Sequence, residues 1–212
     1  MKIENLPNII SVFPLSNFII FPHTSVPLNI FEPRYIEMIN DCIKTHRIIG
    51  IIQPKKLKKD IPELYNVGCA GKITSFNETN DGRYLIVING ITRFKIIKEI
   101  VNNKAYRECE VSFDDYDGDM ISNYNEIKFT DLKLIIKNTK IFFEKNGYMI
   151  NWKELEKQSL DQTINTLAMT SPFSIEEKQV LLETTNINNR KIKFENILNT
   201  YIISDFNNKT IQ

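Results

Sequence analysis

The sequence has few of the residues that hold metals, form disulfides or act as nucleophiles. It contains two histidines and three cysteines in 212 residues. Cys42, Cys69 and Cys109 are odd in number and far apart, which fits a reducing compartment and a role as small core fillers better than a disulfide framework. His23 and His46 are too far apart in sequence to form a paired ligand motif. We therefore expect no metal and no cofactor.

The sequence also lacks an excess of one charge sign and a long apolar run. Lys and Arg number 27 and Asp and Glu 26, so no overall field would draw the protein to nucleic acid or to an anionic membrane. The basic run at residues 55–59 lies beside prolines, and we interpret it as a solvated loop. No segment approaches about 20 apolar residues, and Glu4 and Pro7 interrupt the start, where a signal peptide needs an apolar core. We expect a cytoplasmic protein.

Motifs of catalysis and nucleotide binding are absent as well. There is no G-x-S-x-G and no cysteine in a recognised nucleophile motif. Gly71-Lys72 suggests a phosphate-binding loop, but the required earlier glycine is misplaced and Ile73 stands where a hydroxyl residue is needed. The acidic stretch 114–119 lacks the glutamate that closes an EF-hand loop, so we interpret it as a turn between domains. The sequence predicts no enzyme.

The first half contains short β-prone runs separated by prolines. Residues 8–15 and 25–31 are typical of strands, and Pro22 and Pro27 restrict this stretch to sheet edges and turns because proline donates no backbone hydrogen bond. Pro33 suits the first turn of a helix, and apolar residues then recur on one face (Ile36, Ile39, Cys42 and Ile43). His46 ends this helix, where a cationic imidazole would complement the helix dipole.

A hairpin is predicted at Asp81-Gly82, since glycine supplies the positive φ of a tight turn. The alternating segments around it form an antiparallel meander that is apolar on both faces. Such a sheet is expected to curl into a small barrel.

From about residue 119 onward the pattern is helical. Between residues 125 and 145 apolar residues form one stripe (Ile127, Leu134, Ile135, Ile141 and Phe142). Two pairs of residues have capping-box spacing (Asn151 with Glu154, and Ser174 with Glu177). We therefore predict an α+β protein, with a mostly antiparallel pseudo-barrel and one embedded helix over residues 1–118 and a helical bundle over residues 119–212.

Four longer motifs, in this order, resemble one family: FPLSNFIIFPHTSVPLNIFEPRYIEMI, VGCAGKI, DGRYLIVINGITRF and SPFSIEEKQVLLE. The chain is similar to the Lon protease N-terminal domain family, specifically its short stand-alone bacterial members, over about residues 10–198. The resemblance implies a PUA-like pseudo-barrel followed by a helical bundle, in agreement with the element pattern.

In full Lon proteases this region is attached to an ATPase and a Ser-Lys peptidase, and it contributes to substrate recognition and assembly. The sequence has no Walker motif, so the resemblance brings no proteolysis with it. It implies a non-catalytic module of protein quality control that binds unfolded or exposed hydrophobic polypeptide segments, with a proteolytic machine as a further partner.

The proline-rich stretch supplies the candidate binding residues. If the run at residues 17–21 is exposed, it would offer an adhesive patch to an extended peptide; the same run can equally be a buried strand. The candidate peptide-binding residues are Phe18, Ile19, Ile20, Phe21, Arg34 and Tyr35.

Two further hypotheses involve the charged residues and the C-terminal helices. Glu32 and Arg34 lie at the start of the predicted helix, and we expect one of them to pair with a residue on the meander, with Glu32 and Arg93 as the favoured pair. An enzyme acting on a small ligand would need Glu32, Arg34, Tyr35 and Arg93 to converge, although ion pairing explains these residues more simply. Alternatively, the protein is a structural component that oligomerises or docks on a larger machine through its C-terminal helices. An apolar stripe at 125–145 too wide for one intramolecular contact would favour this alternative.

Overall fold

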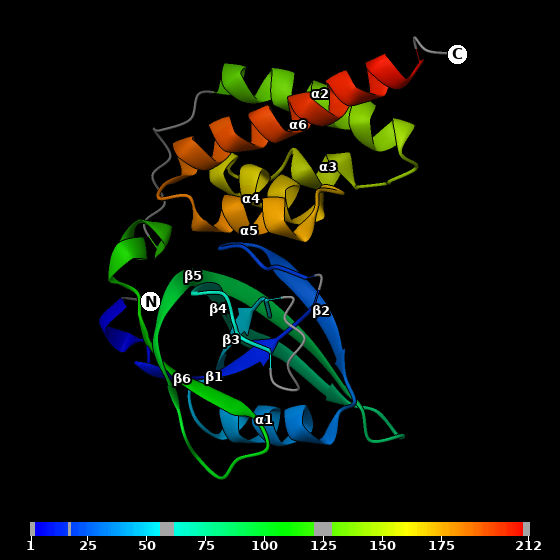
Figure 1. Cartoon of the computed structure of the whole chain (residues 1–212). Coiled ribbons are helices and arrows are strands. Elements are labelled where there is room, and N and C mark those ends of the chain that lie inside the picture. The colour runs from blue at the N-terminus through cyan, green and yellow to red at the C-terminus, as the bar shows by residue number, and fades with distance from the viewer. Residues whose placement is uncertain (1–2, 17, 56–61, 121–128, 210–212) are drawn as a thin grey trace. The chain divides into compact units, whose positions relative to one another are not determined.

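Strands fill the first half of the chain and helices the second (Figure 1). The computed structural model describes residues 3–16, 18–55, 62–120 and 129–209. The chain divides into a barrel unit, residues 1–121, and a helical unit, residues 122–212. The boundary expected from the sequence, between residues 118 and 119, falls inside a 3-10 helix, η2 (Asp114–Met120). Most of the basic run at 55–59, Asn17 and Ile127 lie outside the described residues.

The described part of the barrel unit forms one six-stranded sheet in the order β2-β5-β4-β3-β1-β6. The strands are β1 (Ile9–Pro14), β2 (Ser25–Ile30), β3 (Ile48–Ile52), β4 (Val67–Glu78), β5 (Tyr84–Ile100) and β6 (Arg107–Ser112). Because β5 also pairs with β6, five strands close on themselves and β2 extends the sheet beside β5. All pairs are antiparallel except β1 with β3. The predicted mostly antiparallel pseudo-barrel is confirmed.

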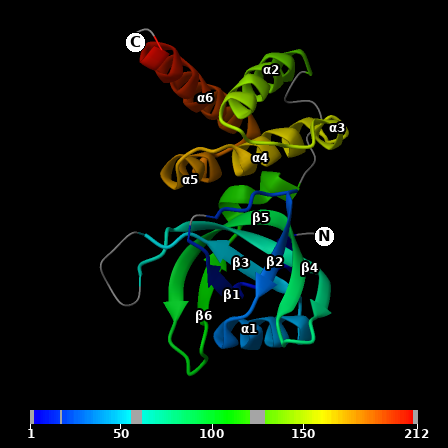
Figure 2. The same cartoon turned by 90° about the vertical axis from the view of Figure 1, so that its right-hand side faces the viewer.

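Local sequence signals explain two features of the barrel. Gly82 has a φ of 78° in the turn between β4 and β5, as the hairpin prediction required. Helix α1 (Pro33–Lys44) begins with Glu32 as its N-cap and proline in its first turn, as predicted. Figures 1 and 2 show this helix lying across one end of the barrel. Its apolar face is buried through Tyr35, Met38, Ile39 and Cys42.

In the turn after α1, His46 does not have the role that the sequence predicted. Its ring nitrogen Nδ1 lies 3.0 Å from the Ile48 backbone nitrogen and accepts that N–H. A nitrogen that accepts a hydrogen bond carries no proton, and burial lowers the pKa of His46. The residue is therefore a neutral acceptor and not a cation complementing the helix dipole.

The barrel core is packed around Phe94. A Cβ atom on Gly50 would lie 2.8 Å from the Phe94 ring, and one on Gly68 would lie 2.6 Å from it, so both glycines make room for this side chain. The cluster around it consists of Ile10, Val12, Ile48, Ile52, Leu64, Ala70, Cys109, Val111 and Phe113. All three cysteines are buried and free, as predicted for core fillers.

The helical unit packs around α6. Its helices are α2 (Phe129–Lys145), α3 (Trp152–Leu155), α4 (Leu160–Thr170), α5 (Ile175–Glu183) and α6 (Ile187–Lys209). Helix α6 contacts α2, α4 and α5. Ser174 and Glu177 form the predicted capping box at the start of α5, and the Asn151 side chain caps α3. Phe142, Phe173 and Tyr201 pack ring to ring between α2, the α4–α5 connection and α6.

Candidate ligand pocket at the start of α1

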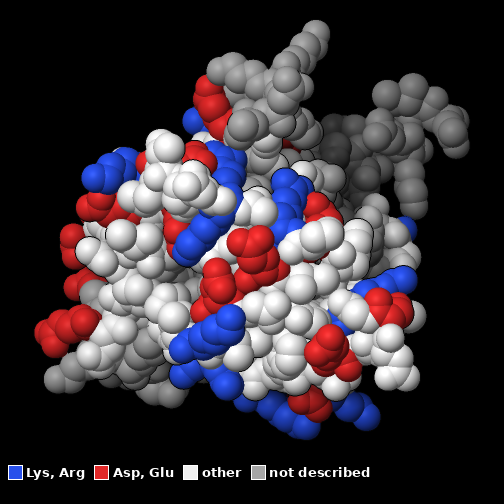
Figure 3. Space-filling view, turned by 90° about the horizontal axis from the view of Figure 1, so that it is seen from below, with Lys and Arg blue, Asp and Glu red and all other residues white. Residues whose placement is uncertain are grey.

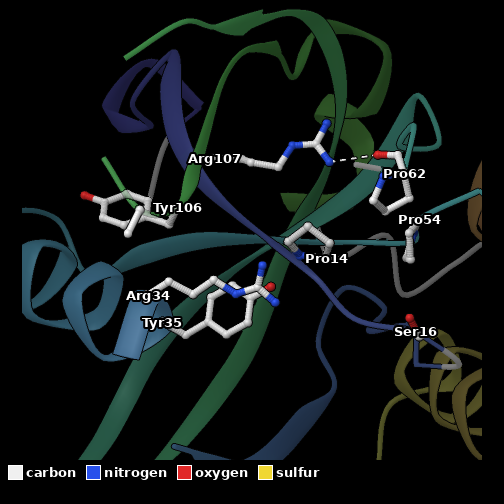
Figure 4. A pocket seen from close by; sticks show the side chains of 9 residues that line it. Pro14, Ser16, Arg34, Tyr35, Pro54, Pro62, Tyr106 and Arg107 are labelled. Atoms are coloured by element: carbon white, nitrogen blue, oxygen red, sulfur yellow. Dashed lines mark hydrogen bonds between the residues drawn. The ribbon is translucent and has the colours of Figure 1, made fainter. Parts of the chain in front are cut away.

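A pocket of about 270 Å³ lies where the N-terminal end of α1 meets β1 and β6 (Figure 4). Its walls come from segments far apart in the sequence: the end of β1, the first turn of α1, two prolines after β3 and the start of β6. The lining residues are Pro14, Ser16, Arg34, Tyr35, Pro54, Pro62, Ala105, Tyr106 and Arg107.

Tyr35 is a deeply buried side chain of the pocket wall, with 6% of its surface exposed. Its ring centroid lies 4.2 Å from that of Phe13, and the Arg34 guanidinium carbon lies 4.6 Å from its centre on a cation–π contact. Burial raises the pKa of the Tyr35 hydroxyl, and the Arg34 charge opposes that shift. The hydroxyl forms no hydrogen bond with any described residue and remains a neutral donor at neutral pH.

Arg34 is oriented by Glu32, two residues earlier. Its Nε and Nη2 atoms donate to Glu32 Oε2 at 3.0 and 2.7 Å. Both side chains are about half exposed, with relative areas of 53% and 44%. Such an exposed pair adds little stability, but it holds the guanidinium over the Tyr35 ring. The Nη1 atom of Arg34 has no hydrogen-bond acceptor among the described residues.

Arg107 faces the pocket from the other side. Its Nε and Nη2 atoms donate to the two carboxylate oxygens of Glu99, at 2.6 and 2.5 Å, and Nη1 donates to the Pro62 carbonyl at 3.0 Å. The hydrogen bonds to Glu99 raise the pKa of Arg107, so its charge is permanent. Each terminal guanidinium nitrogen carries a second hydrogen, so further N–H groups stay available.

Tyr106 contributes its ring to the wall, and its hydroxyl points away from the pocket (Figure 4). The hydroxyl donates to Asp41 Oδ2 on α1 at 2.7 Å. Burial and this hydrogen bond raise the pKa of Tyr106 to about 12. Tyr106 therefore ties β6 to α1 and fixes the shape of the pocket.

The surface around the barrel unit mixes charges of both signs. Figure 3 shows Lys, Arg, Asp and Glu interspersed on the face seen from below. Ion pairs of the barrel unit include Lys98–Glu110 and Lys104–Glu108. The residues that the structure describes contain no group of three or more His, Cys, Asp or Glu suited to a metal ion. No helix in the described ranges is long and apolar enough to cross a membrane.

Comparison with known proteins identifies the family. Residues 9–200 match the model of the ATP-dependent protease La (LON) substrate-binding domain. The chain belongs to this family. It is 28% identical over 188 residues to the Lon protease of Buchnera aphidicola subsp. Acyrthosiphon pisum, with 85% of this chain and 23% of that protein covered. It is 21% identical over 197 residues to the Lon protease of Anaeromyxobacter dehalogenans, with 88% and 22% covered. The chain thus spans about a quarter of the length of these relatives.

Two solved structures of Lon N-terminal domains share the fold. One is the Lon N-terminal domain protein from Xanthomonas campestris, with a TM-score of 0.62, 20% identity, and 86% of this chain and 94% of that chain covered. The other is the N-terminal domain of the Mycobacterium avium complex Lon protease, with a TM-score of 0.61, 16% identity, and 90% and 98% covered. The resemblance of the sequence motifs to the Lon N-terminal domain family is confirmed.

Within this Lon-type fold, the predicted peptide-binding residues separate into two groups. Arg34 and Tyr35 line the pocket. Ile19, Ile20 and Phe21 are 4%, 1% and 0% exposed, so they belong to the core and offer no adhesive patch. Of the two interpretations of this run, the buried one is correct for these three residues. Phe18 is half-buried, and its carbonyl accepts a hydrogen bond from Gln53.

The burial of this run follows from contacts with β5. The His23 N–H donates to the Gly90 carbonyl at 2.9 Å, and the Gly90 N–H donates to the Thr24 carbonyl at 2.8 Å. The Thr24 hydroxyl closes the turn by donating to the Phe21 carbonyl at 2.7 Å. These bonds hold the segment directly against the sheet, and its apolar side chains enter the interior.

The predicted ion pair between Glu32 and Arg93 is wrong. Glu32 pairs with Arg34, whereas Arg93 donates from Nη2 to Asp119 Oδ1 at 2.7 Å and from Nε to Oδ2 at 2.8 Å. The Arg93 side chain is 2% exposed and that of Asp119 8% exposed. The reason is position: Asp119 lies in η2, which packs on β5 and places Tyr116 over the guanidinium at 4.2 Å. Glu32, Arg34, Tyr35 and Arg93 consequently do not form one converging set.

Sequence reasoning missed most of the pocket. Pro14 lies in a predicted strand, Pro54 and Pro62 flank the predicted basic loop, and no sequence pattern singled out Arg107. An available signal was the Tyr106-Arg107 pair at the start of a strand, matching Arg34-Tyr35 at the start of the helix. Only the barrel closure, through pairing of β6 with β1 and β5, brings the two pairs together.

Proposed function

We propose that this chain is a non-catalytic binding module for unfolded or extended polypeptide segments, and that the pocket of Arg34 and Tyr35 is the site that holds them. The observation that carries the proposal is the pocket itself, in a member of the Lon substrate-binding domain family. Proline and alanine walls suit apolar side chains, and the donors of Arg34 and Tyr35 suit the acceptor groups of an extended chain. A proteolytic machine is the corresponding larger partner, as the curated Lon protease relatives suggest.

The size of the pocket favours a weak and general interaction. A cavity of about 270 Å³ is at the small end of ligand sites, so it holds a side chain or two and not a folded surface. We expect fast exchange of many different segments, as quality control requires. We also place the protein in the cytoplasm, because its three buried free cysteines suit a reducing compartment.

The test measures binding of this chain to a second, disulfide-bonded protein that is offered in two states. In one state that second protein is permanently unfolded, because its disulfides are reduced and its cysteines are blocked with neutral groups. In the other state it is native, with its disulfides intact. Ala105→Trp would fill the pocket from an exposed position without changing the core. Lys72→Trp, on the exposed side of β4, is the matched control because it does not line the pocket.

We expect the wild type and Lys72→Trp to bind only the unfolded form, and Ala105→Trp to bind it about tenfold more weakly, measured by isothermal titration calorimetry. Equal affinity of all three chains would show that binding occurs elsewhere. If the wild type shows no binding to the unfolded protein, the proposed function is overturned.

A second candidate function, docking through the C-terminal helices, is supported by helix α2. Ile135 and Phe142 are buried in the helical unit, but Leu134 and Ile141 are 61% and 41% exposed, so the apolar stripe is wider than the intramolecular contact. Lys133, Lys137 and Lys140 lie beside it on the exposed side.

These lysines oppose pairing with a second copy and favour an acidic partner. Size-exclusion chromatography with light scattering should therefore show a monomer for the chain alone. A dimer that disappears in Leu134→Asp/Ile141→Asp would instead assign this face to self-assembly.

A further inference from the structure

Several polar groups of the pocket lining can donate hydrogen bonds. The Tyr35 hydroxyl and the Nη1 atom of Arg34 have no hydrogen-bond partner among the described residues, and Ser16 adds an exposed hydroxyl. Arg107 contributes the N–H groups that Glu99 and Pro62 leave over. The Tyr35 side chain is only 6% exposed, but its hydroxyl is not sealed from solvent and opens into the pocket, where a ligand can reach it. Its natural complement is an acceptor that comes from outside.

The charge around the pocket selects the kind of acceptor. Arg34 is held by Glu32 and Arg107 by Glu99, so these two ion pairs are neutral in sum. A singly charged carboxylate gains the free donors of both guanidiniums and of Tyr35. A phosphate with two negative charges would be repelled about twice as strongly by Glu32 and Glu99 as a carboxylate with one. This repulsion would offset more of the energy that its hydrogen bonds to the donors contribute.

We propose that the pocket takes one carboxylate group of a bound polypeptide, received by Tyr35, Arg34 and Arg107, while the apolar side chain next to it rests on the proline walls. This inference rests on the proposed function and specifies the segments that the module prefers. An Asp or Glu side chain and the C-terminal carboxylate of a chain offer the same chemistry.

Tyr35→Phe is the variant that isolates the proposal. It keeps the ring that packs on Phe13 and under Arg34, and removes only a hydroxyl that has no partner among the described residues, so the fold should be unaffected. Loss of a hydrogen bond to a carboxylate should weaken binding about tenfold or more. Tyr148→Phe is the matched control, because Tyr148 is 49% exposed in the helical unit and does not line the pocket, so the loss of its hydroxyl should leave peptide affinity unchanged.

The experiment uses three fluorescent Gly-Ser peptides and measures anisotropy. The first carries an internal Phe-Asp pair and an amidated C-terminus, the second has Asn in place of Asp, and the third ends in Phe with a free carboxylate and contains no acidic residue. We expect the first or the third to bind the wild type about tenfold more tightly than the second, with the preference lost in Tyr35→Phe and kept in Tyr148→Phe.

The other outcomes are equally informative. Preference for the first peptide assigns the side-chain carboxylate, and preference for the third assigns the chain end; both support the proposal. Equal affinity for all three, while the unfolded protein still binds, overturns the carboxylate inference and leaves the proposed function intact. If neither the peptides nor the unfolded protein bind, both are overturned.

Discussion

The ion pair between Arg93 and Asp119 shows how a single residue can decide where the barrel unit ends and the helical unit begins. Asp119 receives two side-chain N–H groups and the backbone N–H of Arg93, the last at 3.0 Å. His23, at a φ of 61°, donates from its Nε2 atom to the Asp119 carbonyl at 2.6 Å. Two distant segments thus converge on one aspartate, and η2 belongs to the barrel unit for that reason.

Asp119→Ala should destabilise the barrel unit strongly. Arg93 would lose this carboxylate while remaining buried, and breaking a buried pair in this way costs about 3–5 kcal/mol. Glu32→Ala removes an exposed partner and should change the free energy of unfolding by at most about 1 kcal/mol. Thermal unfolding of the two variants checks this, and a double-mutant cycle of Glu32 with Arg93 should give no coupling. Similar losses for both variants would contradict the assignment.

His46 gives the molecule a pH dependence with a defined sign. Because burial lowers its pKa below the ordinary value of 6.5, the unfolded chain binds the proton more readily than the folded one. The stabilising contribution of neutral His46 is therefore complete above pH 6.5 and is lost as the pH falls through the folded pKa.

His46→Asn is the variant that tests this dependence. The Asn side-chain oxygen can accept the Ile48 N–H as Nδ1 does, and it does not titrate. Melting temperatures at pH 7.5 and 5.5 should therefore differ less in His46→Asn than in the wild type. A pH dependence that is the same in both proteins would exclude this histidine as its source.

At the scale of helices and strands, features that depend on neighbouring residues could be predicted from the sequence. Contacts between residues far apart in the sequence could not. Pro33, Gly82 and Ser174 each satisfy a requirement of their immediate backbone, so the helix start, the hairpin and the helix cap could all be predicted. The run at residues 18–21 carries no such local signal. Its burial depends on a strand almost seventy residues away, and periodicity cannot distinguish a buried run from an exposed one. The proline walls of the pocket were unpredictable for the same reason.

Gly90 is the point at which the buried run meets β5. A Cβ atom there would lie 2.2 Å from the Phe21 carbonyl oxygen, which is backbone and cannot move aside. Gly90→Ala should therefore destabilise the barrel unit by about 3 kcal/mol, near the upper end of typical overpacking effects. Gly118→Ala is the control, because nothing lies within 4 Å of its added methyl group, and it should be nearly neutral. Calorimetric melting of both variants checks the difference; a neutral Gly90→Ala would mean that the turn is free to shift.

At the scale of the whole molecule, the chain contains two separate cores. The barrel core surrounds Phe94, whereas the helical unit buries Leu167 of α4 and Phe194 of α6 in its own interior. Each unit has the internal packing that a domain needs to fold by itself.

We therefore expect two melting transitions in differential scanning calorimetry, each sensitive to substitutions in one unit only. Leu167 is fully buried, and Leu167→Ala should remove about 2–5 kcal/mol, enough to lower one transition by roughly 10 °C or more. Asp119→Ala should lower the other transition and leave the first in place. A single transition that moves with both variants would show that the two cores unfold as one cooperative structure, and a ligand held in the barrel pocket would then stabilise both units together.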